Sequence, residues 1–205
     1  MSFLLRGYTT FNNTDYALLY KSEPEGHFVG FEVDGEIGSL NIYNEIAYLS
    51  GTDKITMPGS YQGNLLKNYF MNVLGINYRF KNNLKITVEH LFNGLGDSSN
   101  LDASNIRYKN GLNKSLNEHV TGISLNYEFN PLLIGKYDSK IAWQDSSHQH
   151  NITLIKSITD NLDFILGSQI NIGDRPSGSN WQNPNIQSEF GRQNNKYFFQ
   201  LKSYF

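Results

Sequence analysis

The chain contains no cysteine, which excludes disulfide bonds and thiolate metal ligands. It also lacks any apolar run that approaches the roughly 20 residues of a membrane-spanning helix. Basic charge is not in excess: the formal net charge is −2, so nucleic acid is not an expected partner. The first residues, M-S-F-L-L-R-G-Y, lack the basic start, long apolar stretch and cleavage site of a secretory signal. An exported protein with this sequence is therefore expected to be a mature form or a fragment.

What the 205 residues do contain is a repeated alternation of apolar and polar side chains. Val29, Phe31 and Val33, for example, alternate with Glu32 and Asp34. Apolar residues recur at i, i+2 and i+4, which is the period of a strand and not of a helix. Because such segments follow one another without a helical pattern between them, we expect an all-β antiparallel up-and-down meander.

The sequence predicts ten or eleven strands, depending on whether the short first segment is counted. The expected segments are 3–10, 15–22, 27–37, 40–48, 67–80, 84–93, 118–129, 133–144, 147–158, 162–172 and 195–205. Polar connections separate them, and three of these are long, at about residues 50–65, 94–117 and 173–194.

The long connections all fall at one end of the predicted sheet. Counted back from residue 205, connections alternate between two ends, and every connection at the other end is a short turn. Outer-membrane barrels have this asymmetry, with short periplasmic turns and longer extracellular loops. Aromatic residues are expected to form a girdle at each rim. The girdle residues are Tyr78, Phe80, Tyr127, Phe129 and Phe205 at the short-turn rim, and Tyr48, Phe92 and Trp143 at the other.

The last segment, N-K-Y-F-F-Q-L-K-S-Y-F, places Tyr197, Phe199, Leu201 and Phe205 on one face. With this strand, its alternation and its loop asymmetry, the chain resembles porin-like outer-membrane β-barrel proteins of Gram-negative bacteria. The resemblance implies a transmembrane β-barrel, or a partial or open barrel, surrounded by outer-membrane lipid. It also implies that these four residues are the signal read by the barrel-assembly machinery, although Ser203 stands where a bulky apolar residue is usual.

Bacterial single-chain barrels have even strand numbers, which bears on the domain organisation. We expect residues 1–205 to form a single barrel domain that either closes on ten strands or is the C-terminal portion of a larger barrel.

Charged side chains occupy the face opposite the apolar one, and in a barrel they would line the lumen. The residues predicted to line the pore are Glu32, Asp34, Glu36, Glu45, Arg79, Lys85, Glu89, Glu128, Lys136, Asp138, Lys140, Asp163, Lys196 and Lys202. The resemblance therefore implies a channel for passive diffusion of small hydrophilic solutes. Two alternatives stay open: a structural or adhesive barrel with a filled lumen that binds partners through its outer loops, and a soluble lipocalin-like binder.

No catalytic, cofactor or metal site is predicted, and no enzyme activity is expected. His148 and His150 share a strand face at a spacing that can chelate a metal, but no third ligand lies nearby in the sequence. His90 and His119 are expected on the outward face among lipid headgroups. The sequence has no G-x-S-x-G motif for a nucleophile, and its glycine spacings lack the Lys-Ser/Thr of a phosphate loop.

Overall fold

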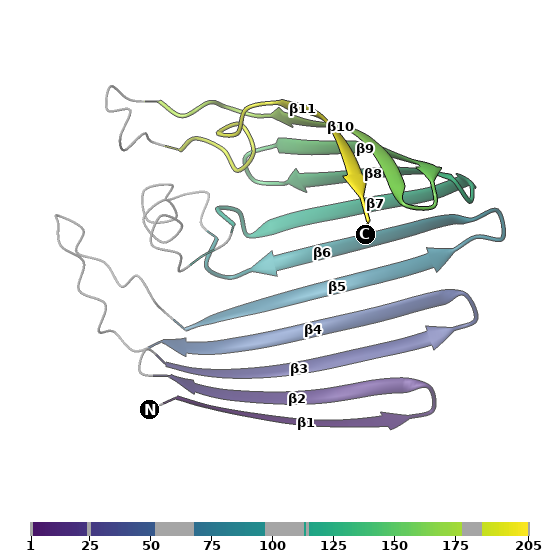
Figure 1. Cartoon of the computed structure of the whole chain (residues 1–205). Helices are drawn as coiled ribbons and strands as arrows, with labels where there is room; N and C mark the ends of the chain where they lie inside the picture. Colours follow the sequence, from purple (N-terminus) through teal and green to yellow (C-terminus); the bar gives the residue numbers. More distant parts are fainter. Residues whose placement is uncertain are drawn as a thin grey trace. The chain divides into compact units, whose positions relative to one another are not determined.

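The computed structural model describes residues 2–23, 26–51, 68–96, 113, 115–177 and 186–204, in which the long regular elements are β-strands (Figure 1). The strands are β1 (Phe3–Phe11), β2 (Thr14–Glu23), β3 (Gly26–Ile37), β4 (Leu40–Gly51), β5 (Tyr69–Arg79), β6 (Leu84–Asn93), β7 (His119–Asn130), β8 (Leu133–Ala142), β9 (Ser147–Thr159), β10 (Leu162–Ile172) and β11 (Lys196–Ser203). Within the described ranges, no helix is long and apolar enough to cross a membrane.

The strands form one antiparallel sheet whose spatial order is the order of the sequence, from β1 to β11. In the part of the chain that the structure describes, this 11-stranded sheet is not closed, so β1 and β11 are its edge strands. The expected all-β meander is therefore confirmed. The count is eleven because the short first segment is a full strand paired with β2 over its whole length.

The chain divides into two compact units. Unit 1 comprises Met1–Gly75 and His90–His119, and unit 2 comprises Ile76–Glu89 and Val120–Phe205. Unit 1 therefore holds β1 to β4 whole, unit 2 holds β8 to β11 whole, and β5, β6 and β7 contribute residues to both.

Tight turns explain where several strands end. Asn12 and Asn13 form the connection from β1 to β2 with φ angles of 49° and 57°. Two positive φ angles define a type I′ turn, whose twist matches that of the flanking strands. Gly38 opens the two-residue connection from β3 to β4 with a φ of 64°, a conformation that glycine adopts without steric cost. These turns fix the register of the hairpins they close.

The register gathers apolar side chains into rows that cross neighbouring strands. In unit 1, Val29 of β3 lies opposite Tyr48 of β4. In unit 2, Leu166 of β10 lies opposite Leu154 of β9 and Phe199 of β11. Because successive side chains point to opposite faces, the charged residues form the intervening rows on the other side. Each unit thus has an apolar face and a charged face.

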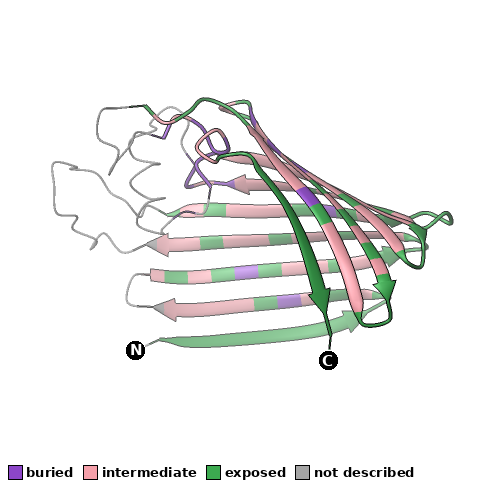
Figure 2. Ribbon diagram, turned by 45° about the horizontal axis from the view of Figure 1, so that its top comes forward, coloured by how far each residue is buried: buried purple, intermediate pink, exposed green. Residues whose placement is uncertain are grey.

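The most buried side chains lie in the long connections and at the strand ends next to them, not in the middle of the strands. Leu95 and Leu116 of unit 1 are buried in the connection from β6 to β7, and Ile186 and Phe190 of unit 2 are buried in the connection from β10 to β11. By contrast, β1 and β11 are exposed along their whole length (Figure 2). Among the described residues, Ala17 and Ala142 are therefore the only buried apolar side chains that the strands contribute.

Candidate functional site

The charged face of unit 1 carries four of the predicted pore-lining residues, and it brings carboxylates together. Glu32 of β3 lies directly opposite Glu45 of β4. Asp34 of β3 lies directly opposite Asp15 of β2, and Glu36 follows it on the same face of β3. Like charges directly opposite each other destabilise a sheet. Each of two neighbouring rows on this face therefore contains one pair of carboxylates that repel each other, Glu32 with Glu45 and Asp15 with Asp34.

The charged face of unit 2 carries seven more of the predicted pore-lining residues, and here an acidic residue faces a basic one. Asp163 of β10 lies opposite Lys202 of β11. It also accepts hydrogen bonds from Ser157 Oγ at 2.8 Å and from Tyr204 Oη at 2.9 Å. Five other predicted pore-lining residues lie on the same face as Asp163, as the register of β7 to β11 shows: Glu128, Lys136, Asp138, Lys140 and Lys196.

Three predicted pore-lining residues lie on β5 and β6, where unit 2 contains the short-turn ends of both strands. Asn77 of β5 and Thr87 of β6 are joined through a side-chain hydrogen bond, which shows that they share a face. By alternation the same face carries Arg79, Lys85 and Glu89.

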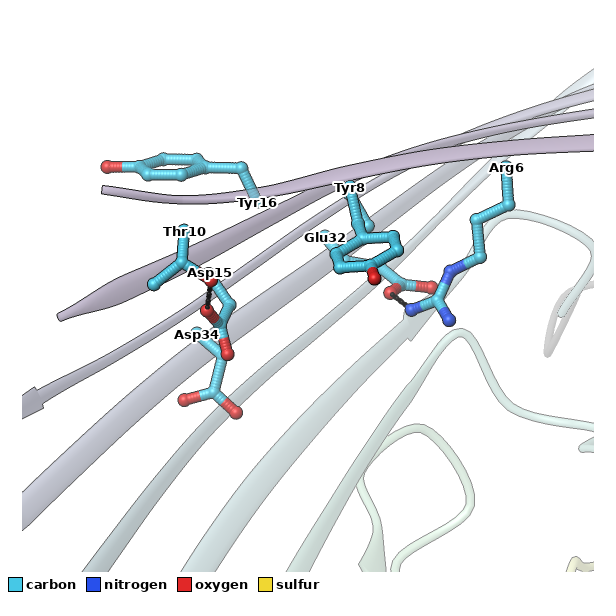
Figure 3. A pocket seen from close by; sticks show the side chains of 8 residues that line it. Arg6, Tyr8, Thr10, Asp15, Tyr16, Glu32 and Asp34 are labelled. Atoms are coloured by element: carbon cyan, nitrogen blue, oxygen red, sulfur yellow. Dashed lines mark hydrogen bonds and ion pairs between the residues drawn. The ribbon is translucent and has the colours of Figure 1, made fainter.

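A hollow of about 350 Å³ lies over the charged face of β1, β2 and β3 (Figure 3). Its lining includes Arg6, Tyr8, Thr10, Asp15, Glu32 and Asp34. Of these the sequence predicts only Glu32 and Asp34 as pore-lining residues: the segment that contains Arg6, Tyr8 and Thr10 is predicted only as a possible short strand, and Asp15 is not assigned to the lining. The signal was present: these three residues alternate with Phe3, Leu5, Gly7 and Thr9, and a two-asparagine turn follows.

Arg6 of β1 crosses β2 to reach Glu32 of β3, with Nη2 at 2.8 Å from Oε2 (Figure 3). Ala17 of β2 lies between the two strands, opposite both Tyr8 and Glu32, and its small side chain leaves room for the guanidinium. The two charged side chains are 56% and 40% exposed, so this ion pair contributes no more than about 1 kcal/mol. It neutralises one carboxylate of the Glu32–Glu45 pair.

The Asp15–Asp34 pair has no such compensation. Thr10 Oγ1 donates to Asp15 Oδ1 at 2.6 Å, and Asn41 Nδ2 donates to Asp34 Oδ1. Both donors are neutral, so they orient the carboxylates without cancelling their charge. Within the described ranges, neither aspartate forms an ion pair. The hollow therefore combines an arginine with two uncompensated carboxylates beside the exposed ring of Tyr8.

The apolar faces carry large exposed side chains, with aromatic pairs near the strand ends. Tyr78 and Phe80 pack edge to face with centroids 4.5 Å apart, and Tyr127 and Phe129 pack in the same way at 4.7 Å. Both pairs lie beside short turns, where the sequence places one aromatic girdle. Trp143, at the other end of β8, donates from Nε1 to Thr121 Oγ1 at 2.8 Å. The aromatic residues therefore occupy both ends of these strands.

His150 makes the contacts nearest to a catalytic arrangement. Its Nδ1 lies 2.9 Å from Tyr137 Oη and 3.1 Å from Ser139 Oγ. A serine nucleophile needs an accessible hydroxyl and a group that orients the second histidine nitrogen. Ser139 is only 5% exposed, and no described residue pairs with His150 Nε2. This cluster therefore lacks two elements of a nucleophilic site.

Four histidines form two histidine pairs among the described residues, whereas His27 contacts Tyr20. His148 stacks with His150 at a centroid separation of 6.1 Å, and His90 Nε2 lies 3.2 Å from His119 Nδ1. No group of three histidine, aspartate or glutamate residues that could hold a metal ion occurs in the described part of the chain.

Two of the long connections pack against strand ends through clusters of polar side chains. In the sequence these residues indicate only that the segments are loops. In unit 1, the buried Asn93 at the end of β6 donates from Nδ2 to Asn113 Oδ1 at 2.9 Å. In unit 2, residues 186–195, termed here the docked segment, are held by the side chains of Asp145, in the connection from β8 to β9, and Ser147, the first residue of β9. Asp145 Oδ2 accepts from the Glu189 amide at 2.7 Å, and Ser147 Oγ accepts from the Phe190 amide at 3.2 Å.

The docked segment also meets the charged face of β9 and β10 through amide side chains. Gln193 Oε1 accepts from Gln169 Nε2 at 2.9 Å and from Gln149 Nε2 at 3.3 Å. Asn171 Nδ2 donates to the carbonyl oxygen of Asn194 at 2.9 Å. These uncharged groups hydrogen-bond to one another, so the charged face carries uncharged side chains where it meets the docked segment.

No protein-family model, curated protein or solved structure matches this chain.

Proposed function

We propose that this chain is all or part of a porin-like channel of the bacterial outer membrane, through which small hydrophilic solutes diffuse passively. The observation that carries the proposal is the exposure of the apolar face. On β10 and β11, Leu166, Phe199 and Leu201 lie in adjacent rows and are 50%, 76% and 62% exposed. A sheet in water buries such a face under a second layer, whereas a barrel in a membrane turns it toward lipid. The described residues supply no second layer.

The charged faces supply the solute path in this proposal. Carboxylates and lysines in rows keep a lumen hydrated, and their balance tunes which solutes pass. The mechanism is diffusion, so it needs no catalytic residue and no cofactor. The pattern of connections supports the same orientation: those that follow odd-numbered strands have two to four residues, whereas the long ones follow β4, β6 and β10.

The odd number of described strands supports the proposal that this chain is part of a larger barrel. In an antiparallel meander with an odd number of strands, the first and last strands run in the same direction. A barrel closed by antiparallel pairs alone therefore requires at least one strand beyond those described. The exposed edge of β1 would receive it.

The edge strand β11 is the proposed contact for the barrel-assembly machinery. Tyr197, Phe199 and Leu201 share its apolar face and are all strongly exposed, so they are accessible to a partner. Phe205, the fourth residue of the expected signal, lies outside the described residues.

Reconstitution of the refolded full chain in planar lipid bilayers tests the channel. We expect stepwise increases in conductance at fixed voltage. Stable insertion without conductance would favour the structural or adhesive barrel with a filled lumen. Recovery of the chain as a monodisperse soluble protein without detergent would overturn the membrane assignment.

A matched pair of substitutions in β10 tests which face meets lipid. Leu166→Arg introduces a charge on the apolar face, and Ile165→Arg introduces the same charge on the charged face one residue away. At the middle of a bilayer the first costs about 2–4 kcal/mol, whereas the second projects into water. We expect Leu166→Arg alone to reduce the yield of folded protein in lipid vesicles. Equal yields for the two variants would contradict the proposal.

A further inference from the structure

We infer that the hollow on β1, β2 and β3 binds a small zwitterion of dipeptide length, with Arg6 holding its carboxylate and the Asp15–Asp34 pair holding its ammonium group. The inference rests on the proposed function in one respect: it names a solute class for the face assigned to the lumen. Binding itself does not depend on conduction.

The cation-binding part of the hollow is the Asp15–Asp34 pair. Each carboxylate has one oxygen fixed by a neutral donor, Thr10 or Asn41, and neither has a positively charged partner among the described residues. Two carboxylates directly opposite each other repel, and an ammonium group between them converts that repulsion into two charge-assisted hydrogen bonds. An ammonium group has three donors, which suits two acceptors and a neighbouring hydroxyl.

The anion-binding part is Arg6. Its guanidinium uses Nη2 for Glu32, lines the hollow and is 56% exposed, so its other N–H groups remain accessible to a ligand. Arginine has five donors and binds carboxylates in a planar, bidentate manner. The Glu32 pairing fixes where the guanidinium lies, because it draws Arg6 across β2 over Ala17.

The spacing between the two parts sets the length of the ligand. Arg6 reaches the row that contains Tyr8 and Glu32, and the aspartates occupy the next row on the same face. Adjacent rows are two residues apart along a strand, which is roughly 7 Å. An extended dipeptide spans about the same distance between its charged ends. A volume of about 350 Å³ is at the small end of ligand pockets, and the Tyr8 ring, 82% exposed, offers a surface for the intervening peptide group.

Titration of the refolded full chain in detergent micelles with glycylglycine, followed by NMR at the Tyr8 and Thr10 amides, tests the inference. We expect a saturable shift with an affinity at least about tenfold higher than for ethylammonium or acetate, each of which makes half of the charged contacts. The variant Arg6→Gln and the double variant Asp15→Asn/Asp34→Asn should each lose about tenfold. Glu128→Gln removes one negative charge on β7, outside the hollow, and should leave the affinity unchanged.

Ethylammonium binding as tightly as glycylglycine would overturn the inference, since attraction of any cation would then suffice. The same follows if Glu128→Gln weakens binding as much as the hollow variants do. Conductance without glycylglycine binding would refute this inference and leave the channel intact. Binding without conductance would refute the channel and leave the hollow as a solute site.

Discussion

Asp34 and Asp163 both lie on a charged face, toward the short-turn end of their strand, yet their surroundings differ. Asp163 faces Lys202 and accepts hydrogen bonds from Ser157 and Tyr204. Asp34 faces another aspartate, and the donor to it is the neutral Asn41. Ser157 and Tyr204 are neutral donors, and within the described ranges Asp163 forms no ion pair with Lys202. The difference is the sign of the charge directly opposite each aspartate, which is positive at Asp163 and negative at Asp34.

The two regions also differ in what packs against their strands. In unit 2 the docked segment forms hydrogen bonds with polar side chains at the ends of β9 and β10 that lie next to the long connection. Both units end at an exposed edge strand, but the β1–β3 region of unit 1 keeps an open hollow beside it. Unit 2 thus contains a polar network that joins a connection to its strands, whereas unit 1 retains a repulsive pair that the proposed solute would neutralise.

The largest effect is expected when the docked segment is displaced. In Gly191→Ala the added Cβ would lie 2.4 Å from the carbonyl oxygen of Asp174 and from the carbonyl carbon of Gly173. Backbone atoms cannot move aside as a side chain can, so overpacking should cost about 1–3 kcal/mol. We expect a lower urea midpoint for the refolded chain in micelles and faster hydrogen exchange at the Glu189 and Phe190 amides.

Gly122→Ala is the matched control for this substitution. A Cβ at Gly122 of β7 meets nothing within 4 Å, so the substitution should be neutral or stabilising by up to about 1 kcal/mol. If both variants unfold at the same urea concentration, the docked segment contributes nothing to unit 2, and the contrast between the units loses its basis.

Asp163→Asn is expected to have the next largest effect. The substitution keeps the shape but removes the charge that strengthens the bonds from Ser157 and Tyr204, and it leaves Lys202 without its opposite charge. Loss of charge assistance in exposed surroundings should lower the free energy of unfolding by about 1 kcal/mol. The urea midpoint measures it. An unchanged midpoint would mean that the balanced row around Asp163 has no energetic role.

Much of the fold could be predicted from the sequence because the signal is local. Alternation alone fixes which side chains share a face, and turn residues such as Asn12, Asn13 and Gly38 mark the strand ends. The strands Leu84–Asn93 and Leu162–Ile172 have the bounds that the pattern predicts. The strand β1 is less certain from the sequence because its alternating segment is short, and Leu4 interrupts the alternation at its start.

The site was less predictable because its contacts join residues far apart in the chain. Arg6 meets Glu32 only when the register of three strands places Ala17 between them. The Asp145–Glu189 bond links residues 44 positions apart, and neither residue lies in an alternating segment. Asparagine and serine in long connections give no indication of whether they pack against strand ends. Such contacts can be identified only when the arrangement of the strands is known.

Arg6→Gln should have a smaller effect than Asp163→Asn. It leaves Glu32 directly opposite Glu45 without a compensating charge. An exposed ion pair and a repulsive cross-strand pair are each worth under about 1 kcal/mol, so we expect a loss near 0.5 kcal/mol at low salt. The difference from the unsubstituted chain should diminish as salt is added, because the charges are exposed. A loss that is independent of salt would indicate a packing role for the Arg6 stem instead.

The smallest expected change in stability is also the most informative, because it is a gain where the other charge substitutions give a loss. Asp34→Asn keeps an acceptor for Asn41 but removes the repulsion with Asp15, so it should raise the free energy of unfolding by a few tenths of a kcal/mol. Added salt should reduce this gain, since it already screens the repulsion in the unsubstituted chain. The same Asp→Asn substitution would thus stabilise at position 34 and destabilise at position 163. If both substitutions lower the urea midpoint, the carboxylates of the hollow serve the sheet, and the case for a solute that neutralises them loses its energetic support.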